Sequence, residues 1–147
     1  MFHLPPLLTI PIITGLLAQI LKFTIKSIRR KKISWHLWEG YGGIPSVHTT
    51  LVISLITVIA LSESITSSAF SVAIVFAVLT IRDALGLRKF LGDHGKILNM
   101  LISDMPEKYK SNSYPEHLRE NLGHSMVEVI AGAGFGVIVS TLLYFLI

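Results

Sequence analysis

The sequence predicts an all-α integral membrane protein, a helical bundle of about four spans with an interfacial amphipathic helix on its cytoplasmic side. Of its 147 residues, 51% are hydrophobic and only 15% are charged, a balance that a single soluble core of this size could hardly bury. Four apolar runs, at residues 4–21, 44–61, 65–81 and 127–147, cover roughly half of the chain. We therefore expect one membrane-embedded domain over residues 1–147.

The first and last runs are long enough to cross about 30 Å of hydrocarbon, whereas the two middle runs lie near the lower limit for a span. A short polar turn at residues 62–68 joins the middle runs into a helical hairpin. The first run has no preceding basic residue and no small-residue cleavage site, so we expect it to remain in the mature protein. The absence of cysteine excludes disulfides, thiolate metal ligands and cysteine nucleophiles.

The distribution of positive charge predicts the orientation in the membrane. All thirteen Lys and Arg residues lie in segments 22–32 and 82–119, which flank the hairpin, so the positive-inside rule makes both segments cytoplasmic. The run at residues 29–32 is expected to bind anionic headgroups, with each base contributing about 1 kcal/mol. Apolar residues recur at helical spacing between positions 83 and 105, which predicts the amphipathic helix, and residues 106–115 are expected to form a loop.

A first candidate site is the segment Gly42-Gly43-Ile44-Pro45-Ser46-Val47-His48, which leads into the second apolar run. The free amides and positive dipole end of a helix start favour an anion, and Ser46 could either cap the helix or donate its hydroxyl to a phosphate oxygen. A simple transition from loop to helix would also explain the Gly, Pro and Ser residues. His48 favours a functional site, because a histidine inside an apolar membrane segment is costly and is usually functional or paired.

A second candidate site lies at the start of the last apolar run, where His124 and Glu128 are four residues apart and share a helical face. A carboxylate bonded to one imidazole nitrogen fixes the tautomer and makes the other nitrogen a better nucleophile or base. A purely structural ion pair is the alternative. A zinc site that uses histidines elsewhere in the chain has little support, since no two histidines show metal-binding spacing on one helix.

The parity of membrane crossings places Lys22, residues 45–48, residues 82–89 and residues 123–128 at one membrane face. Lys22 could be a snorkelling anchor at the end of the first run or part of the site. Several bases, two histidines and a helix amino terminus suit phosphoryl transfer, in which catalysis is chiefly positioning and charge neutralisation. Three glycines in the last run, Gly132, Gly134 and Gly136, indicate close helix packing.

The ordered motifs resemble the type-2 phosphatidic acid phosphatase superfamily, and most closely its short divergent bacterial and plant branch. They are Ala18-Gln19-x-x-Lys22, the Gly42–His48 segment, Arg82-Asp83-Ala84-x-Gly86-x-Arg88-Lys89, Leu98-Asn99 and Leu122-Gly123-His124-x-x-x-Glu128-Val129. The resemblance covers nearly the whole chain.

The resemblance implies a phospho-histidine mechanism that needs no metal or other cofactor. His124 would attack phosphorus, Glu128 would orient it, and His48 would protonate the departing oxygen. The phosphoryl oxygens would be held by Lys22, Ser46, Val47, Arg88 and Arg119, with backbone amides between residues 43 and 47. The chain departs from the superfamily pattern at two places. The superfamily has Ser-Arg beginning six residues before the nucleophilic histidine, where this chain has Leu118 followed by Arg119. The family also commonly has a small residue at the position of Val47.

The expected function is hydrolysis of a lipid phosphomonoester or diphosphate, such as phosphatidylglycerophosphate, phosphatidate or an isoprenyl diphosphate. The alternative is a non-catalytic membrane protein that binds anionic lipid or a partner through its basic face. A transporter has little room for alternating access in four short runs, and bases that border apolar spans without stacking aromatics do not suit nucleic acid. We expect a bacterial inner or plasma membrane location with the site facing the cytoplasm, and the sequence leaves open whether the chain forms a homo-oligomer.

Overall fold

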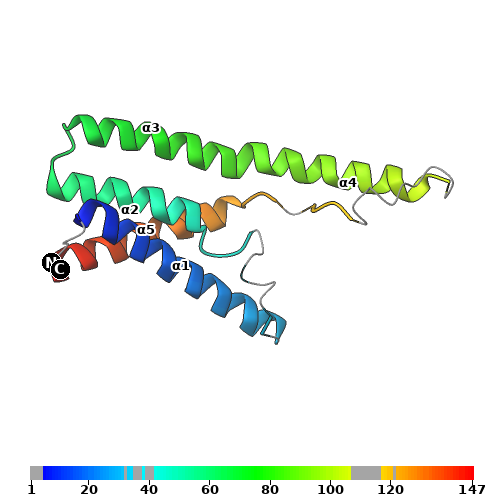
Figure 1. Ribbon diagram of the computed structural model, residues 1–147, viewed down its shortest axis with the longest axis horizontal. Coiled ribbons are helices and arrows are strands. Elements are labelled where there is room, and N and C mark those ends of the chain that lie inside the picture. The colour runs from blue at the N-terminus through cyan, green and yellow to red at the C-terminus, as the bar shows by residue number, and fades with distance from the viewer. Residues whose placement is uncertain (1–4, 32, 35–37, 39–41, 107–116, 121) are drawn as a thin grey trace.

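The computed structural model describes residues 5–31, 33–34, 38, 42–106, 117–120 and 122–147. Its elements are α1 (Pro6–Arg30), α2 (Val47–Ser62), α3 (Ser68–Arg82), a π-helical turn η2 (Asp83–Leu87), α4 (Arg88–Asp104) and α5 (Met126–Leu146) (Figure 1). The predicted all-α class is confirmed, and the four apolar runs correspond to α1, α2, α3 and α5. The predicted loop at residues 106–115 and Lys32 of the basic run lie, apart from Pro106, outside the described residues.

Helix α2 is the centre of the bundle, because it packs against α1, α3 and α5 (Figure 1). Its core residues include Val52 and Val58, which are 2% and 0% exposed. Small polar residues are buried with them, and several of their hydroxyls bond to the preceding turn or across helices, whereas the hydroxyl of buried Ser54 has no hydrogen-bond partner among the described residues. Thr50, for example, donates to the carbonyl of Ser46 at 2.9 Å and to that of Gly132 at 3.0 Å. These bonds allow hydroxyl groups to lie in a dry core.

Helices α2 and α5 approach each other closely at two glycines. A Cβ atom on Gly132 would lie 2.6 Å from the carbonyl oxygen of Ser46, and one on Gly136 would lie 2.8 Å from that of Thr50. Any side chain at these positions would push the helices apart. The predicted small-residue packing face of the last helix is therefore confirmed for Gly132 and Gly136, whereas Gly134 has open space around it.

The outer surfaces of the bundle are apolar, as a hydrocarbon environment requires. Three helical segments are long and apolar enough to cross a membrane, namely Pro6–Arg30, Ser68–Asp104 and Met126–Leu146. Helix α2 has 16 residues, which gives it a length of only about 24 Å. The central helix is therefore shorter than the hydrocarbon layer, whereas α1, α5 and the continuous segment Ser68–Asp104 are longer than α2.

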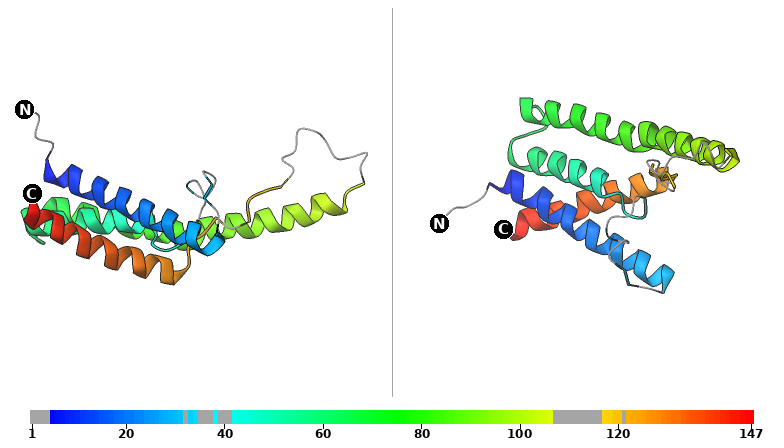
Figure 2. Two further views of the ribbon diagram at one scale, coloured as in Figure 1. Left: turned by 90° about the horizontal axis from the view of Figure 1, so that it is seen from below. Right: turned by 45° about the vertical axis from the view of Figure 1, so that its right-hand side comes forward.

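The predicted amphipathic helix is present as α4, and it continues directly from α3 through η2. Figure 2 shows this continuous rod extending well beyond the rest of the bundle. Helix α4 buries Gly92 and Gly95 and exposes large apolar residues along its length, including Leu91, Leu98 and Leu101. Its position at the membrane interface stays a prediction.

The predicted parity of the helix ends is confirmed. The start of α1, the end of α5 and the α2–α3 turn lie at one end of the bundle (left in Figure 1), while the end of α1 and the starts of α2 and α5 lie at the other. The motif residues of the sequence are thus gathered at one end. Which side of the membrane this end faces stays a prediction.

Candidate active site

The start of α5 holds His124 against Glu128. Ser125 is the N-cap of α5, and its Oγ accepts the Glu128 N–H at 3.3 Å while Glu128 Oε2 accepts the Ser125 N–H at 3.1 Å, a capping box. The same Oε2 lies 2.9 Å from Nδ1 of His124, whose residue is only 7% exposed. An ionised carboxylate oxygen can only accept, so Nδ1 is the donor in this bond, and in a neutral imidazole Nε2 then keeps its lone pair. The predicted contact between the two side chains is confirmed, but the predicted shared helical face is wrong, because His124 precedes the N-cap and lies outside α5.

The second carboxylate oxygen of Glu128 binds the segment that precedes α2. Oε1 accepts the Gly43 N–H at 2.7 Å, and the backbone carbonyl of Glu128 accepts the Ser46 N–H at 3.0 Å. Gly42 and Gly43 have φ values of 68° and 105°, which favour glycine. Two of the amides expected to cradle a phosphate are therefore already bonded to Glu128. The free amides in this region are those of the first turn of α2, beginning at Val47.

His48 faces His124 across the site from the first turn of α2. The centroids of the two imidazole rings are 6.3 Å apart and their planes are inclined by 58°. Residues 76 positions apart in the sequence are thus brought together, as the sequence analysis expected. His48 is the more exposed of the two rings, whereas His124 is buried.

Two lysines on one face of α1 supply positive charge. Lys22 is 7% exposed and lies within electrostatic range of both His48 and Glu128. Lys26, one helical turn further on, lies so close to Gly43 that a Cβ atom there would meet its Cε at 2.7 Å and its Nζ at 3.5 Å. Lys22 was predicted at the site from the sequence, whereas Lys26 was not. Its spacing of four residues from Lys22 was the available signal.

Arg88 brings a third cation from the start of α4. Its Nε donates to Asp83 Oδ2 at 2.7 Å, and both residues lie within electrostatic range of His48. Asp83 was part of a recognised motif, but the sequence analysis gave it no role.

The remaining predicted phosphate-binding residues lie less directly at the site. Ser46 is 0% exposed and its Oγ accepts a bond from Thr49 Oγ1 at 3.0 Å. The alternative that Ser46 caps α2 through its side chain is wrong, since no such bond forms and the hydroxyl is turned towards Thr49. Val47 begins α2 and is half-buried. Arg119 is exposed in a segment whose backbone packs on Gly95 of α4.

Two other motif residues anchor loops. Asn99 accepts the Leu118 N–H and donates to its carbonyl, both at 2.9 Å, and also donates to Glu120 Oε1 at 2.9 Å. Gln19 donates to the carbonyl of Trp38 at 2.7 Å. Among the residues that the structure describes, no three His, Asp or Glu side chains come together in a metal-binding cluster.

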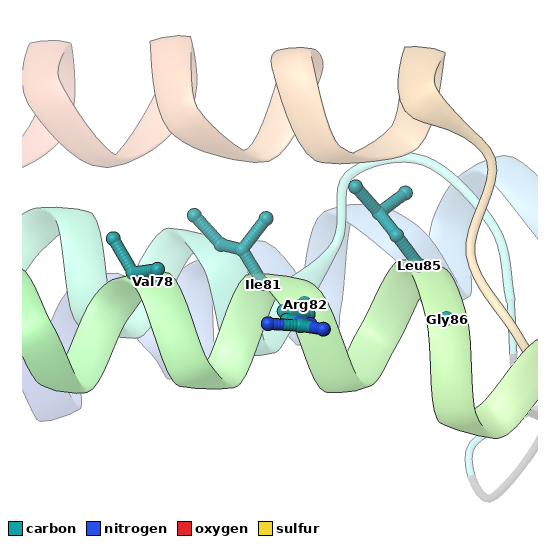
Figure 3. Close-up of a pocket in the computed structure, with 5 residues that line it drawn as sticks. All are labelled: Val78, Ile81, Arg82, Leu85 and Gly86. Carbon is teal, nitrogen blue, oxygen red and sulfur yellow. The ribbon is translucent and has the colours of Figure 1, made fainter.

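An apolar groove of about 460 Å³ begins beside this cluster and runs along α3. It is lined by Val78, Ile81, Arg82, Leu85 and Gly86. Figure 3 shows the side chains of Val78, Ile81 and Leu85 pointing to the same side of α3, towards α5. The groove and the cluster share the turn η2, since Leu85 and Gly86 line the groove and Ala84 in the same turn accepts the His124 N–H at 3.0 Å.

The fold and the cluster define an integral membrane protein with a cation-lined pair of histidines at one end of its bundle. The chain belongs to the Divergent PAP2 family, which it matches over residues 5–139, a branch of a phosphatase-related superfamily. It is also similar to the "Uncharacterized membrane protein YuiD" of Bacillus subtilis (strain 168), with 33% identity over 135 residues, covering 86% of this chain and 85% of the relative. No solved structure matches the chain.

Proposed function

We propose that the protein is a membrane phosphatase that hydrolyses a phosphomonoester or diphosphate of a lipid through a phospho-histidine intermediate. The observation that supports this most strongly is the pair of imidazoles 6.3 Å apart, one of which is bonded to a carboxylate at 2.9 Å. An activated nucleophile needs a base or carboxylate partner, and a departing ester oxygen needs an acid on its far side. The two rings supply these groups.

In the first step, Nε2 of His124 attacks phosphorus and the bond between phosphorus and the ester oxygen breaks. Protonated His48 gives its proton to that oxygen, so the product leaves as an alcohol, or as a phosphate ester when the substrate is a diphosphate. Attack begins at about 3–3.5 Å, and the acid bonds to the leaving oxygen at about 2.7–3 Å. This path through one phosphoryl group is somewhat longer than the 6.3 Å between the ring centroids, so flanking the group requires the two rings to separate slightly when substrate binds.

In the second step, water attacks the phosphorus bound to His124. His48, now neutral, takes the proton from the water, and the bond between phosphorus and nitrogen breaks to release inorganic phosphate. His48 returns to its protonated form, and His124 recovers its lone pair. The bond from Nδ1 to Glu128 is kept throughout, which holds the ring in one orientation and stabilises its positive charge.

The cations around the histidines support phosphoryl chemistry, because negative charge spreads over the equatorial oxygens in the transition state. Lys22, Lys26 and Arg88 lie around the site on two separate helices. We propose that these residues, together with Ser46, Val47 and Arg119, hold the phosphoryl oxygens. Ser46 would donate its hydroxyl proton, which is compatible with its oxygen accepting from Thr49 Oγ1.

The groove along α3 favours a lipid as the substrate. It is apolar, opens on the outer surface of a membrane helix and begins at the turn that bonds His124. A tail lying there would leave its phosphate at the cationic end of the bundle. Phosphatidylglycerophosphate, phosphatidate and isoprenyl diphosphates all fit this description. We propose that hydrolysis occurs at the cytoplasmic face of a bacterial inner or plasma membrane.

The proposal is tested by phosphate release from these three lipids in nanodiscs, with vanadate as competitor. We expect His124→Ala and His48→Ala each to lower the rate by at least 10³-fold, because nucleophile and acid act as a unit. His94→Ala is the matched control, since this exposed histidine lies on α4 and should leave the rate unchanged. Unchanged release in both site variants would refute the proposal. Anionic lipid binding that survives loss of both histidines, without phosphate release by the wild type, would support the non-catalytic alternative.

A further inference from the structure

The turn η2 between α3 and α4 has an unusual backbone. The N–H of Arg88 bonds to the carbonyl of Asp83, five residues earlier, while the helices on both sides are α-helical. Single π-helical turns within α-helices are rare and occur frequently at functional sites. A regular α-helix would also join α3 to α4 in one continuous rod. The π-helical turn therefore matters mainly for where it places the side chains of its residues.

The wider turn places two side chains together that a regular helix would separate. In an α-helix, residues five apart point about 140° away from each other around the axis. Here the i to i+5 hydrogen bond completes one turn, and Arg88 Nε donates to Asp83 Oδ2 at 2.7 Å. Arginine has five N–H donors, so this single bond leaves both terminal nitrogens of the guanidinium for another anion.

The same turn also holds the backbone of the proposed nucleophile. Ala84, which is 2% exposed, accepts the N–H of His124 at 3.0 Å through its carbonyl. Asp83 and Arg88 both lie within electrostatic range of His48. One short turn therefore contacts the His124 segment through its backbone and carries an aspartate–arginine pair within electrostatic range of the second imidazole.

We propose that Asp83 is a positioning residue that fixes the guanidinium of Arg88 over the phosphoryl group, and that η2 exists to align this pair with the two histidines. The inference rests on the proposed phosphatase function. Without Asp83, the long arginine side chain would sample several rotamers and would be held over the site only part of the time. The guanidinium of Arg88 would then bind an anion more weakly.

A double-mutant cycle distinguishes this role from a merely structural one. Binding of orthovanadate to the protein in nanodiscs is measured by calorimetry for the wild type, Asp83→Ala, Arg88→Ala and the double variant. We expect Asp83→Ala to weaken binding about tenfold, the scale of a lost hydrogen bond to a charged group. The same change in the Arg88→Ala background should have almost no effect. Asp83→Glu, which can still accept from Arg88, should restore part of the affinity.

The control is Asp93→Ala, an exposed carboxylate on α4, which should bind vanadate like the wild type. Circular dichroism and size-exclusion chromatography establish that each variant is folded. Additive losses from Asp83→Ala and Arg88→Ala, or wild-type affinity in Asp83→Ala, would overturn this inference and leave the phosphatase proposal intact. A wild type that binds no vanadate would refute the phosphatase proposal, and this inference with it.

Discussion

The carboxylate of Glu128 connects the fold to the chemistry, and its replacement by glutamine gives a prediction with a calculable magnitude. In the wild type this carboxylate accepts from three donors, namely the N–H of Gly43 at 2.7 Å, the N–H of Ser125 at 3.1 Å and Nδ1 of His124 at 2.9 Å. Glutamine has almost the same shape, but one of its two terminal atoms is a donor. No orientation of the amide can therefore satisfy all three partners.

The first orientation of the amide directs its NH2 group at Gly43. The Gly43 N–H then loses its acceptor, which costs about 1–3 kcal/mol for a buried group, while His124 keeps its tautomer without the negative charge that stabilises it. The second orientation directs the NH2 group at His124. The imidazole must then accept at Nδ1 and carry its proton on Nε2, so it has no lone pair for phosphorus.

We therefore expect Glu128→Gln to slow formation of the phospho-enzyme by about 10³–10⁴-fold, the scale of a wrong-tautomer substitution in a serine-protease triad. Unfolding free energy should fall by about 1–3 kcal/mol. Rapid-quench kinetics with a radiolabelled lipid phosphate and thermal unfolding in detergent measure the two effects. The control is Glu63→Gln in the exposed turn at the far end of the bundle. A phospho-enzyme rate within threefold of the wild type would refute this reasoning.

Three further predictions concern packing, charge and the groove. Gly132→Ala should lower the unfolding free energy by about 1–3 kcal/mol, because its Cβ would meet the carbonyl oxygen of Ser46 at the start of α2 at 2.6 Å. Gly134→Ala, with open space around it, should change stability little. Equal losses in thermal unfolding would contradict the close packing of α2 on α5. Lys26→Met should raise KM for a lipid phosphate about tenfold with a smaller change in kcat; steady-state kinetics that show an unchanged KM would remove Lys26 from the site. Ile81→Trp, which fills the groove, should slow hydrolysis of a long-chain lipid phosphate about tenfold relative to a short-chain analogue. Leu16→Trp on the exposed face of α1 should slow neither substrate. If Ile81→Trp slowed both substrates equally, no lipid tail would lie in the groove.

Much of the fold could be predicted from the sequence because hydrophobic runs and their turns are local signals. The His124–Glu128 contact was also predicted, from a spacing of four residues, although His124 precedes the N-cap Ser125 and is reached by the carboxylate that caps the helix. Parity of crossings was enough to place the motif residues at one end, and the structure confirms that His48 and His124 face each other.

The features that the sequence did not predict depend on long-range contacts or on unusual backbone geometry. The bond from Gly43 to Glu128 joins residues 85 positions apart, and nothing local indicates that it removes an amide from the expected phosphate cradle. The π-helical turn between α3 and α4 has no hydrophobic period of its own, so no sequence pattern indicates it. Serine is a residue type that commonly caps helices, but the hydrogen bond from Thr49 determines where the hydroxyl of Ser46 points.

The most direct test of the account is to identify the phosphorylated residue. Wild-type protein is mixed with a radiolabelled lipid phosphate, quenched in alkali within milliseconds, digested and mapped by mass spectrometry. The account predicts an acid-labile, alkali-stable phosphate on His124 that is absent from His124→Ala. Phosphate on any other residue, or hydrolysis without a labelled intermediate in the wild type, would contradict it.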